Sequence, residues 1–155
     1  MARLFDLAES GFFYTRLGNP TLDYVEKKIA ALEGGIGAML TSSGQAASFL
    51  SVFNLLGAGD HLVASSAIYG GTFNLFAVTM KRMGIETTFV PPSASADEIA
   101  AAFRPNTRAL FAESVTNPSL EVADFAKLST VAHAHGVPLI IDNQPLAFIL
   151  TILNV

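Results

Sequence analysis

The segment from Arg108 to Asp142 reads RALFAESVTNPSLEVADFAKLSTVAHAHGVPLIID. It opens with a run at 108–112 that is apolar after Arg108 and closes with an apolar run at 138–141, and both have the length of buried strands. Between them, Asp124 to His135 carries apolar residues at helical spacing, and Gly136 follows as a helix stop. Strand, helix and strand in this order predict a parallel pair joined by a right-handed crossover.

The same alternation begins at Asn19, a typical helix N-cap with Pro20 in the first turn, and Gly34 stops that first helix. Ser95 and Glu98 form a capping-box pattern at the start of another. The full pattern predicts helices at 20–33, 44–56, 70–80, 96–103 and 124–135 and strands at 38–41, 61–64, 86–90, 108–112 and 138–141. About five buried strands separated by amphipathic helices predict an α/β fold, a mostly parallel sheet with helices on both faces.

Composition narrows the classes of function. The 155 residues, 51% of them hydrophobic, fit one compact domain. Lys and Arg number 9 against 13 Asp and Glu, and the net charge of −4 predicts no basic surface for nucleic-acid phosphates. The absence of cysteine excludes a disulfide framework, a thiolate metal site and a cysteine nucleophile. His61, His133 and His135 lack metal-ligand spacing and are interpreted as structural or surface residues.

Neither end of the chain predicts a membrane partner. Arg3, Asp6 and Glu9 interrupt the apolar core that a secretory signal would need. The apolar run at 146–153 is far shorter than the roughly 20 residues of a helix that spans a bilayer. We therefore expect a cytoplasmic protein.

Polar residues follow four predicted strands at the carboxyl edge of the sheet, which is where open α/β sheets bind ligands. They occupy 41–45, 65–69, 113–117 and 142–143. The first segment places Ser43, Gly44 and Gln45 where a strand turns into a helix, and this predicts either an anion site or an ordinary helix cap. No G-x-G-x-x-G or G-x-x-x-x-G-K-[ST] motif is present, so a plain nucleotide-binding domain loses its main support.

Two further residues at this edge have two interpretations each. Asp142 follows directly on an apolar strand and is either a solvated loop acid or the partner of a cationic ring nitrogen, such as that of a pyridoxal cofactor. Tyr69 is either a core aromatic at a helix start or a ring that lies flat on such a cofactor.

A series of short motifs follows in order along the chain. They are Tyr14-Thr15-Arg16, Gly18-Asn19-Pro20-Thr21, Leu32-Glu33-Gly34-Gly35, Ser43-Gly44-Gln45, Gly59-Asp60-His61, Tyr69-Gly70-Gly71-Thr72, Glu113-Ser114, Asn117-Pro118, His135-Gly136-Val137 and Asp142-Asn143. In this order they strongly resemble the Cys/Met-metabolism family of pyridoxal-phosphate (PLP)-dependent enzymes. The resemblance covers about residues 2–143, and 64–80 is most similar to the O-acetylhomoserine sulfhydrylase branch.

The resemblance implies part of a fold-type I large domain, of the aspartate aminotransferase-like architecture. It divides the chain into an N-terminal segment with inter-subunit contacts at 1–18, a partial PLP-binding domain at 19–143 and an unrelated apolar tail at 144–155. It also implies that the backbone N–H groups of Gly44 and Gln45 hold the cofactor phosphate. Tyr14 and Arg16 would reach the phosphate of a neighbouring subunit, so a homo-oligomer, a dimer or tetramer, is expected.

The same resemblance assigns the residues around the cofactor ring. Tyr69 would stack on the pyridine ring, and Asp142 would keep the ring nitrogen protonated. Asn117 would hydrogen-bond the ring hydroxyl, with Glu113 as a supporting acid behind these contacts. Tyr69 and Asp142 are the implied catalytic residues, and no metal is expected.

The chain departs from the family in two places. It has no Ser-x-x-Lys segment, whose lysine forms the Schiff base, and Lys27, Lys28, Lys81 and Lys127 are no substitutes. After Asn143 the family usually continues with Thr, whereas here Gln144 begins the unrelated tail. We therefore expect an inactive fragment that lacks the N-terminal arm, the lysine segment and the C-terminal domain, and that binds PLP weakly and without a covalent bond at most.

The implied reaction is a γ-replacement in methionine and cysteine biosynthesis (transsulfuration), in which an amino-acid substrate, O-acetylhomoserine, reacts with sulfide to give homocysteine and acetate. Cystathionine γ-synthase, cystathionine γ-lyase and methionine γ-lyase of the same family remain alternatives, as does a non-catalytic remnant. No nucleic acid or membrane is expected as a partner.

Overall fold

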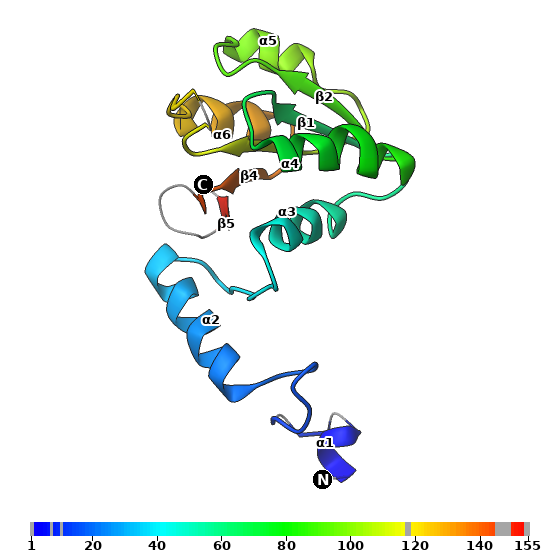
Figure 1. Ribbon diagram of the computed structural model, residues 1–155, viewed down its shortest axis with the longest axis vertical. Helices are drawn as coiled ribbons and strands as arrows, with labels where there is room; N and C mark the ends of the chain where they lie inside the picture. Colours follow the sequence, from blue (N-terminus) through cyan, green and yellow to red (C-terminus); the bar gives the residue numbers. More distant parts are fainter. Residues whose placement is uncertain (1, 7, 10, 117–118, 145–149, 154–155) are drawn as a thin grey trace. The chain divides into compact units, whose positions relative to one another are not determined.

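The computed structural model describes residues 2–6, 8–9, 11–116, 119–144 and 150–153 (Figure 1). The chain divides into two compact units, Met1–Thr41 and Ser42–Val155, which are described separately.

The first unit contains α1 (Ala2–Phe5) and α2 (Pro20–Glu33). The local signals of α2 act as predicted, because the Asn19 side chain accepts the N–H of Thr21 at 2.9 Å and Gly34 ends the helix with φ at 66°. Glycine is the residue most favoured at a positive φ, because residues with a Cβ are strained there.

The strand predicted at 38–41 is wrong. The structure has no strand there, and Met39 is 68% exposed. The N–H of Leu40 donates to Glu26 Oε1 of α2 at 2.8 Å, where a strand would donate to a neighbouring strand. A short apolar run can form a strand only where another strand pairs with it, and no strand in the described part of the chain pairs with this segment.

The second unit is built on one sheet in the order β2-β1-β3-β4-β5. Its strands are β1 (His61–Ser65), β2 (Glu86–Val90), β3 (Thr107–Glu113), β4 (Leu139–Asp142) and β5 (Leu150–Leu153). The first four are parallel, as predicted, and β5 pairs with β4 in the antiparallel direction. The sequence pattern had indicated no strand at β5.

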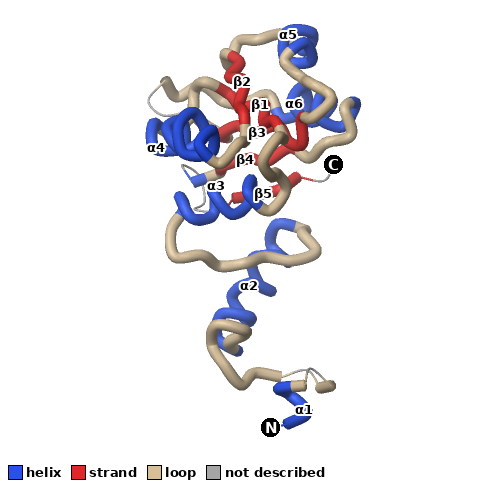
Figure 2. Tube along the Cα trace, turned by 90° about the vertical axis from the view of Figure 1, so that its right-hand side faces the viewer, coloured by secondary structure: helices blue, strands red, loops and turns tan. Residues whose placement is uncertain are grey.

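Helices cover both faces of this sheet, and α4 and α6 lie on opposite sides of the strands in Figure 2. One side carries α3 (Gly44–Phe53), α4 (Gly70–Asn74) and the π-helix η1 (Leu75–Met80). The other carries α5 (Ala96–Ala101) and α6 (Phe125–Ala134). The α/β prediction is therefore confirmed, although α3 ends earlier than expected and the predicted helix at 70–80 finishes as a π-helix.

Successive strand residues point to opposite faces and so divide the core into two clusters. The α3–η1 side buries Leu62, Ala64, Ala109, Phe111 and Ile140 against Val52, Leu56, Phe76 and Met80. The α5–α6 side buries Val63, Leu110, Ala112, Leu139 and Ile141 against Ile99, Leu128, Val131 and Ala132. No helix in the described ranges is long and apolar enough to cross a bilayer.

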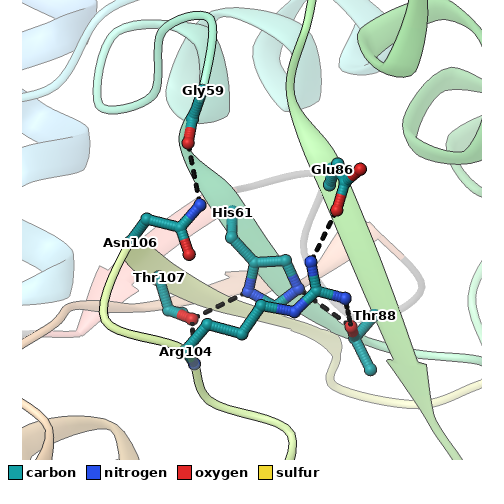
Figure 3. A network of polar contacts seen from close by, with 7 residues as sticks. All are labelled: Gly59, His61, Glu86, Thr88, Arg104, Asn106 and Thr107. Atoms are coloured by element: carbon teal, nitrogen blue, oxygen red, sulfur yellow. Dashed lines mark hydrogen bonds and ion pairs between the residues drawn. The ribbon is translucent and has the colours of Figure 1, made fainter.

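A buried histidine joins three strands near their amino ends (Figure 3). His61 is fully buried, with Nδ1 2.7 Å from Thr107 Oγ1 on β3 and Nε2 2.8 Å from Thr88 Oγ1 on β2. Arg104 donates its backbone N–H to Thr107 and a guanidinium N–H to Thr88, and it forms an ion pair with Glu86. This amino-edge network places His61 in the fold, in agreement with its structural interpretation.

Candidate functional site

Two buried carboxylates lie side by side at the carboxyl edge of the sheet. Glu113 ends β3 and Asp142 ends β4, and they are cross-strand partners in the parallel register. Each is 3% exposed. Phe111 and Ile140, two residues earlier on the same strands, belong to the core on the α3–η1 side. Because strand residues two apart share a face, both carboxylates face the helices of that side.

Glu113 holds the start of α4. Its Oε1 accepts the backbone N–H of Tyr69 at 2.6 Å, which fixes the residue that precedes the first turn of the helix. A carboxylate that accepts a backbone N–H makes a stronger bond than a neutral acceptor. Glu113 thus holds the backbone at Tyr69, and its role as a supporting acid of a cofactor site stays a prediction.

The Asp142 carboxyl is buried with one described hydrogen bond, in which its Oδ1 accepts the backbone N–H of Gln144 at 3.0 Å. Burial raises the pKa of this carboxyl above its ordinary value, and the Gln144 N–H offsets part of that shift. A carboxylate in this position is stabilised by a cation, and a protonated ring nitrogen is such a cation. The site therefore fits the pyridinium end of PLP.

The Tyr69 ring lies over Gly71 beside this edge. A Cβ on Gly71 would come within 2.5 Å of Tyr69 Cε1, so only glycine leaves room for the ring in this orientation. Tyr69 is 55% exposed, which removes the interpretation as a core aromatic. The ring is available to stack on a ligand.

The start of α3 has the ordinary helix cap that the sequence allowed, and the anion site that the sequence also allowed stays a prediction. Ser43 is an ordinary N-cap, and its Oγ accepts the N–H of Ala46 at 3.0 Å. Within the described residues, the N–H groups of Gly44 and Gln45 have no hydrogen-bond partner. Free N–H groups and the positive end of the helix dipole favour an anion, and a phosphate fits this position.

The remaining predicted site residues are Asn117, Tyr14 and Arg16. Asn117 lies outside the described residues. Tyr14 and Arg16 belong to the first unit, where the Arg16 guanidinium carbon lies 5.2 Å from the centroid of the Tyr14 ring. Tyr14 is 53% exposed, and its role toward a neighbouring subunit stays a prediction.

Gln144 is a residue of this edge that the sequence interpretation missed. Its carboxamide lies against the Cα of Gly44, in the space where a side chain of residue 44 would be. Its position two residues after Asp142 could have indicated that it lies near this edge. Its contact with residue 44 could not have been predicted, because the two residues are 100 positions apart in the sequence.

A cavity of about 60 Å³ lies largely on the α5–α6 side, and Glu113 is the predicted site residue that it includes. Lys127 also lines it, and its Nζ donates to the Ala94 carbonyl at 2.8 Å. Neither Asp142 nor the first residues of α3 line this cavity.

Comparison with known proteins settles the family. The family model described as Cys/Met metabolism PLP-dependent enzyme matches residues 1–151. The chain belongs to this family. It is 54% identical over 142 residues to a sulfhydrylase of Fusarium oxysporum f. sp. lycopersici, and 49% identical to an O-acetyl-L-homoserine sulfhydrylase of Leptospira meyeri. Each alignment covers 92% of this chain, and the chain spans about a third of these relatives, 33% and 32% of their lengths.

Solved structures confirm the fold-type I architecture. A crystal structure of a putative O-acetylhomoserine (thiol)-lyase from Campylobacter jejuni superposes with a TM-score of 0.85 at 38% identity. The match covers 92% of this chain and 35% of that protein, which contains N'-pyridoxyl-lysine-5'-monophosphate. The structure of metB from Corynebacterium glutamicum gives a TM-score of 0.81 at 36% identity, over 87% of this chain and 35% of that one.

Proposed function

We propose that this protein is a PLP-dependent transferase in which sulfide replaces the acetate of O-acetyl-L-homoserine to give homocysteine, in methionine biosynthesis. The names of the relatives support the reaction, and the buried Asp142 carboxylate supports the cofactor site. When bound, PLP supplies an electron sink for carbanions beside the substrate amino group.

Different residues of the site bind different parts of the cofactor. The Asp142 carboxylate holds a proton on the ring nitrogen, and the Tyr69 ring stacks on the ring face. The N–H groups of Gly44 and Gln45 bind the phosphate. Glu113 keeps Tyr69 in place through the 2.6 Å bond to its N–H, which orients the stacking ring.

Three further parts of the proposal rest on the family resemblance. Asn117 hydrogen-bonds the ring hydroxyl, and Tyr14 and Arg16 complete the phosphate site of a neighbouring subunit in a homo-oligomer. An arginine fork suits a phosphate because it donates two parallel N–H bonds. The protein is cytoplasmic. Because residues 1–155 contain no Ser-x-x-Lys segment, this chain binds PLP without a Schiff base.

The cofactor site is tested with the purified chain by a PLP titration followed by borohydride reduction and peptide mass analysis. We expect saturable binding that Asp142→Asn weakens at least tenfold, since the neutral amide cannot pair with the ring cation, and no phosphopyridoxyl group on one specific lysine. The exposed acid Asp97 offers a matched control, Asp97→Asn, with unchanged affinity. Equal affinities of the wild type and Asp142→Asn would refute the assignment of Asp142.

The reaction is tested with the full-length protein. Homocysteine release from O-acetylhomoserine and sulfide supports the sulfhydrylase. Cystathionine formation or cleavage, or γ-elimination of methionine, would instead assign the protein to the alternative branches of the family. Absence of any turnover would favour a non-catalytic remnant.

A further inference from the structure

Gln144 connects the two ends of the candidate cofactor site. Its backbone N–H donates to Asp142 Oδ1 at 3.0 Å, at the end that would hold the ring nitrogen. Its carboxamide lies against Gly44, at the end that would hold the phosphate, and Nε2 is the atom nearest to the space left by the missing side chain. One residue therefore touches both ends.

The donors at the phosphate end have no acceptor. Among the described residues, no hydrogen bond is found for the N–H groups of Gly44 and Gln45 or for Nε2 of Gln144. Gln144 is exposed, so its carboxamide is open to a ligand. Several N–H donors gathered without an acceptor favour an anion with several oxygens, and a phosphate is such an anion. The buried Asp142 carboxylate independently points to a cationic group at the other end.

We propose that the Gln144 carboxamide is a further ligand of the cofactor phosphate and donates an N–H from Nε2 beside the N–H groups of Gly44 and Gln45. This inference rests on the proposed function. In this chain a Cβ at position 44 would overlap the carboxamide and push it away. The role belongs to this chain in particular, because it carries Gln144 where the family usually has Thr.

The experiment measures the affinity of the purified chain for PLP and for pyridoxal, which lacks the phosphate. A donor to the phosphate acts on PLP alone. Gln144→Leu removes the donor at similar size, and we expect about tenfold weaker binding of PLP with pyridoxal unchanged, the effect of one hydrogen bond to a charged group. Gln144→Glu places a negative charge there and weakens PLP further. Asn54→Leu, an amide at the far end of α3, is the control.

A second substitution tests the contact itself. Gly44→Ala keeps the backbone N–H but displaces the carboxamide, so it also weakens PLP selectively, and the double variant with Gln144→Leu loses less than the two single losses combined. Inorganic phosphate competes with PLP for the wild type and competes less well for Gln144→Leu. Circular dichroism and the melting temperature establish that each variant is folded.

The outcomes separate this inference from the proposed function. If the wild type binds PLP and Gln144→Leu binds it equally or more tightly, the carboxamide is no ligand and the inference alone fails. Equal losses for PLP and pyridoxal would assign Gln144 a structural role and also overturn it. If the wild type binds neither PLP nor inorganic phosphate, the cofactor site fails together with the inference.

Discussion

Replacing Thr107 by valine removes the hydroxyl that contacts both Arg104 and His61 in the amino-edge network. Thr107 Oγ1 accepts the backbone N–H of Arg104 at 2.8 Å and contacts His61 Nδ1 at 2.7 Å. Thr107 is 5% exposed and His61 is fully buried, so water does not replace the lost bonds. Valine has nearly the same shape as threonine, and the change isolates the hydroxyl.

The cost follows from the groups left without partners. A buried polar group that loses its partner costs about 1–3 kcal/mol. Thr107→Val leaves two such groups, the ring of His61 and the main-chain N–H of Arg104, and the second is only partly buried. We therefore expect the substitution to lower the free energy of unfolding by about 2–4 kcal/mol. Thr88→Val removes the contact with Nε2 but lies at a partly exposed position, so its effect is smaller.

Urea unfolding followed by circular dichroism measures the change as a lower midpoint with an unchanged slope. Thr130→Val is the matched control, since the Thr130 hydroxyl donates to the Ala126 carbonyl on the exposed side of α6 and its loss costs little. A loss below about 0.5 kcal/mol for Thr107→Val, the usual range of surface substitutions, would refute the argument that this hydroxyl supports the network.

Three more predictions concern charge and the site. Burial, reinforced by the Arg104 charge and opposed by Glu86, lowers the pKa of His61 below 6.5, so unfolding at acidic pH takes up a proton. The urea midpoint should therefore be highest above about pH 6.5 and fall as the pH is lowered below that value. A midpoint that does not change between pH 5 and 8 would contradict this. Burial raises the pKa of Asp142, so the ionised carboxylate lowers the stability of the fold as the pH rises above 3.8. Asp142→Asn should therefore raise the urea midpoint at pH 7 while it weakens PLP binding. A lower midpoint would show that the carboxylate stabilises the fold. Gly71→Ala forces the Tyr69 ring away, so it should weaken PLP and pyridoxal alike, by roughly tenfold for one lost stacking contact; unchanged affinity for both ligands would separate Tyr69 from the ring site.

Local signals predicted the elements that local interactions define. Asn19 with Pro20 and Gly34 bounded α2 to the residue, and the Ser95 capping box marked the start of α5, because caps act within one turn of the helix. The run at 38–41 was read as a strand from its apolar residues alone. Whether such a run joins a sheet depends on pairing with a neighbouring strand, and the residues of the run do not indicate whether such a strand is present.

The site was predictable to the extent that topology fixes it. Parallel strands end at one edge, so Glu113 and Asp142 were expected together, and the register places them side by side. The use of Glu113 to hold the Tyr69 N–H, and the reach of Gln144 to Gly44, depend on side-chain contacts between distant segments. Such contacts cannot be predicted from a pattern of residues along the sequence.

The length of β3 has a consequence for how this protein tolerates change. The strand carries Thr107 of the amino-edge network at its first residue and Glu113 of the candidate site at its last. The six steps between these two residues, at about 3.3 Å each, place the ends roughly 20 Å apart. Substitutions that far apart usually have additive effects on stability. Stabilising changes at the amino edge could therefore offset the instability of new residues beside Asp142, and the carboxyl edge would remain free to acquire another substrate preference during evolution.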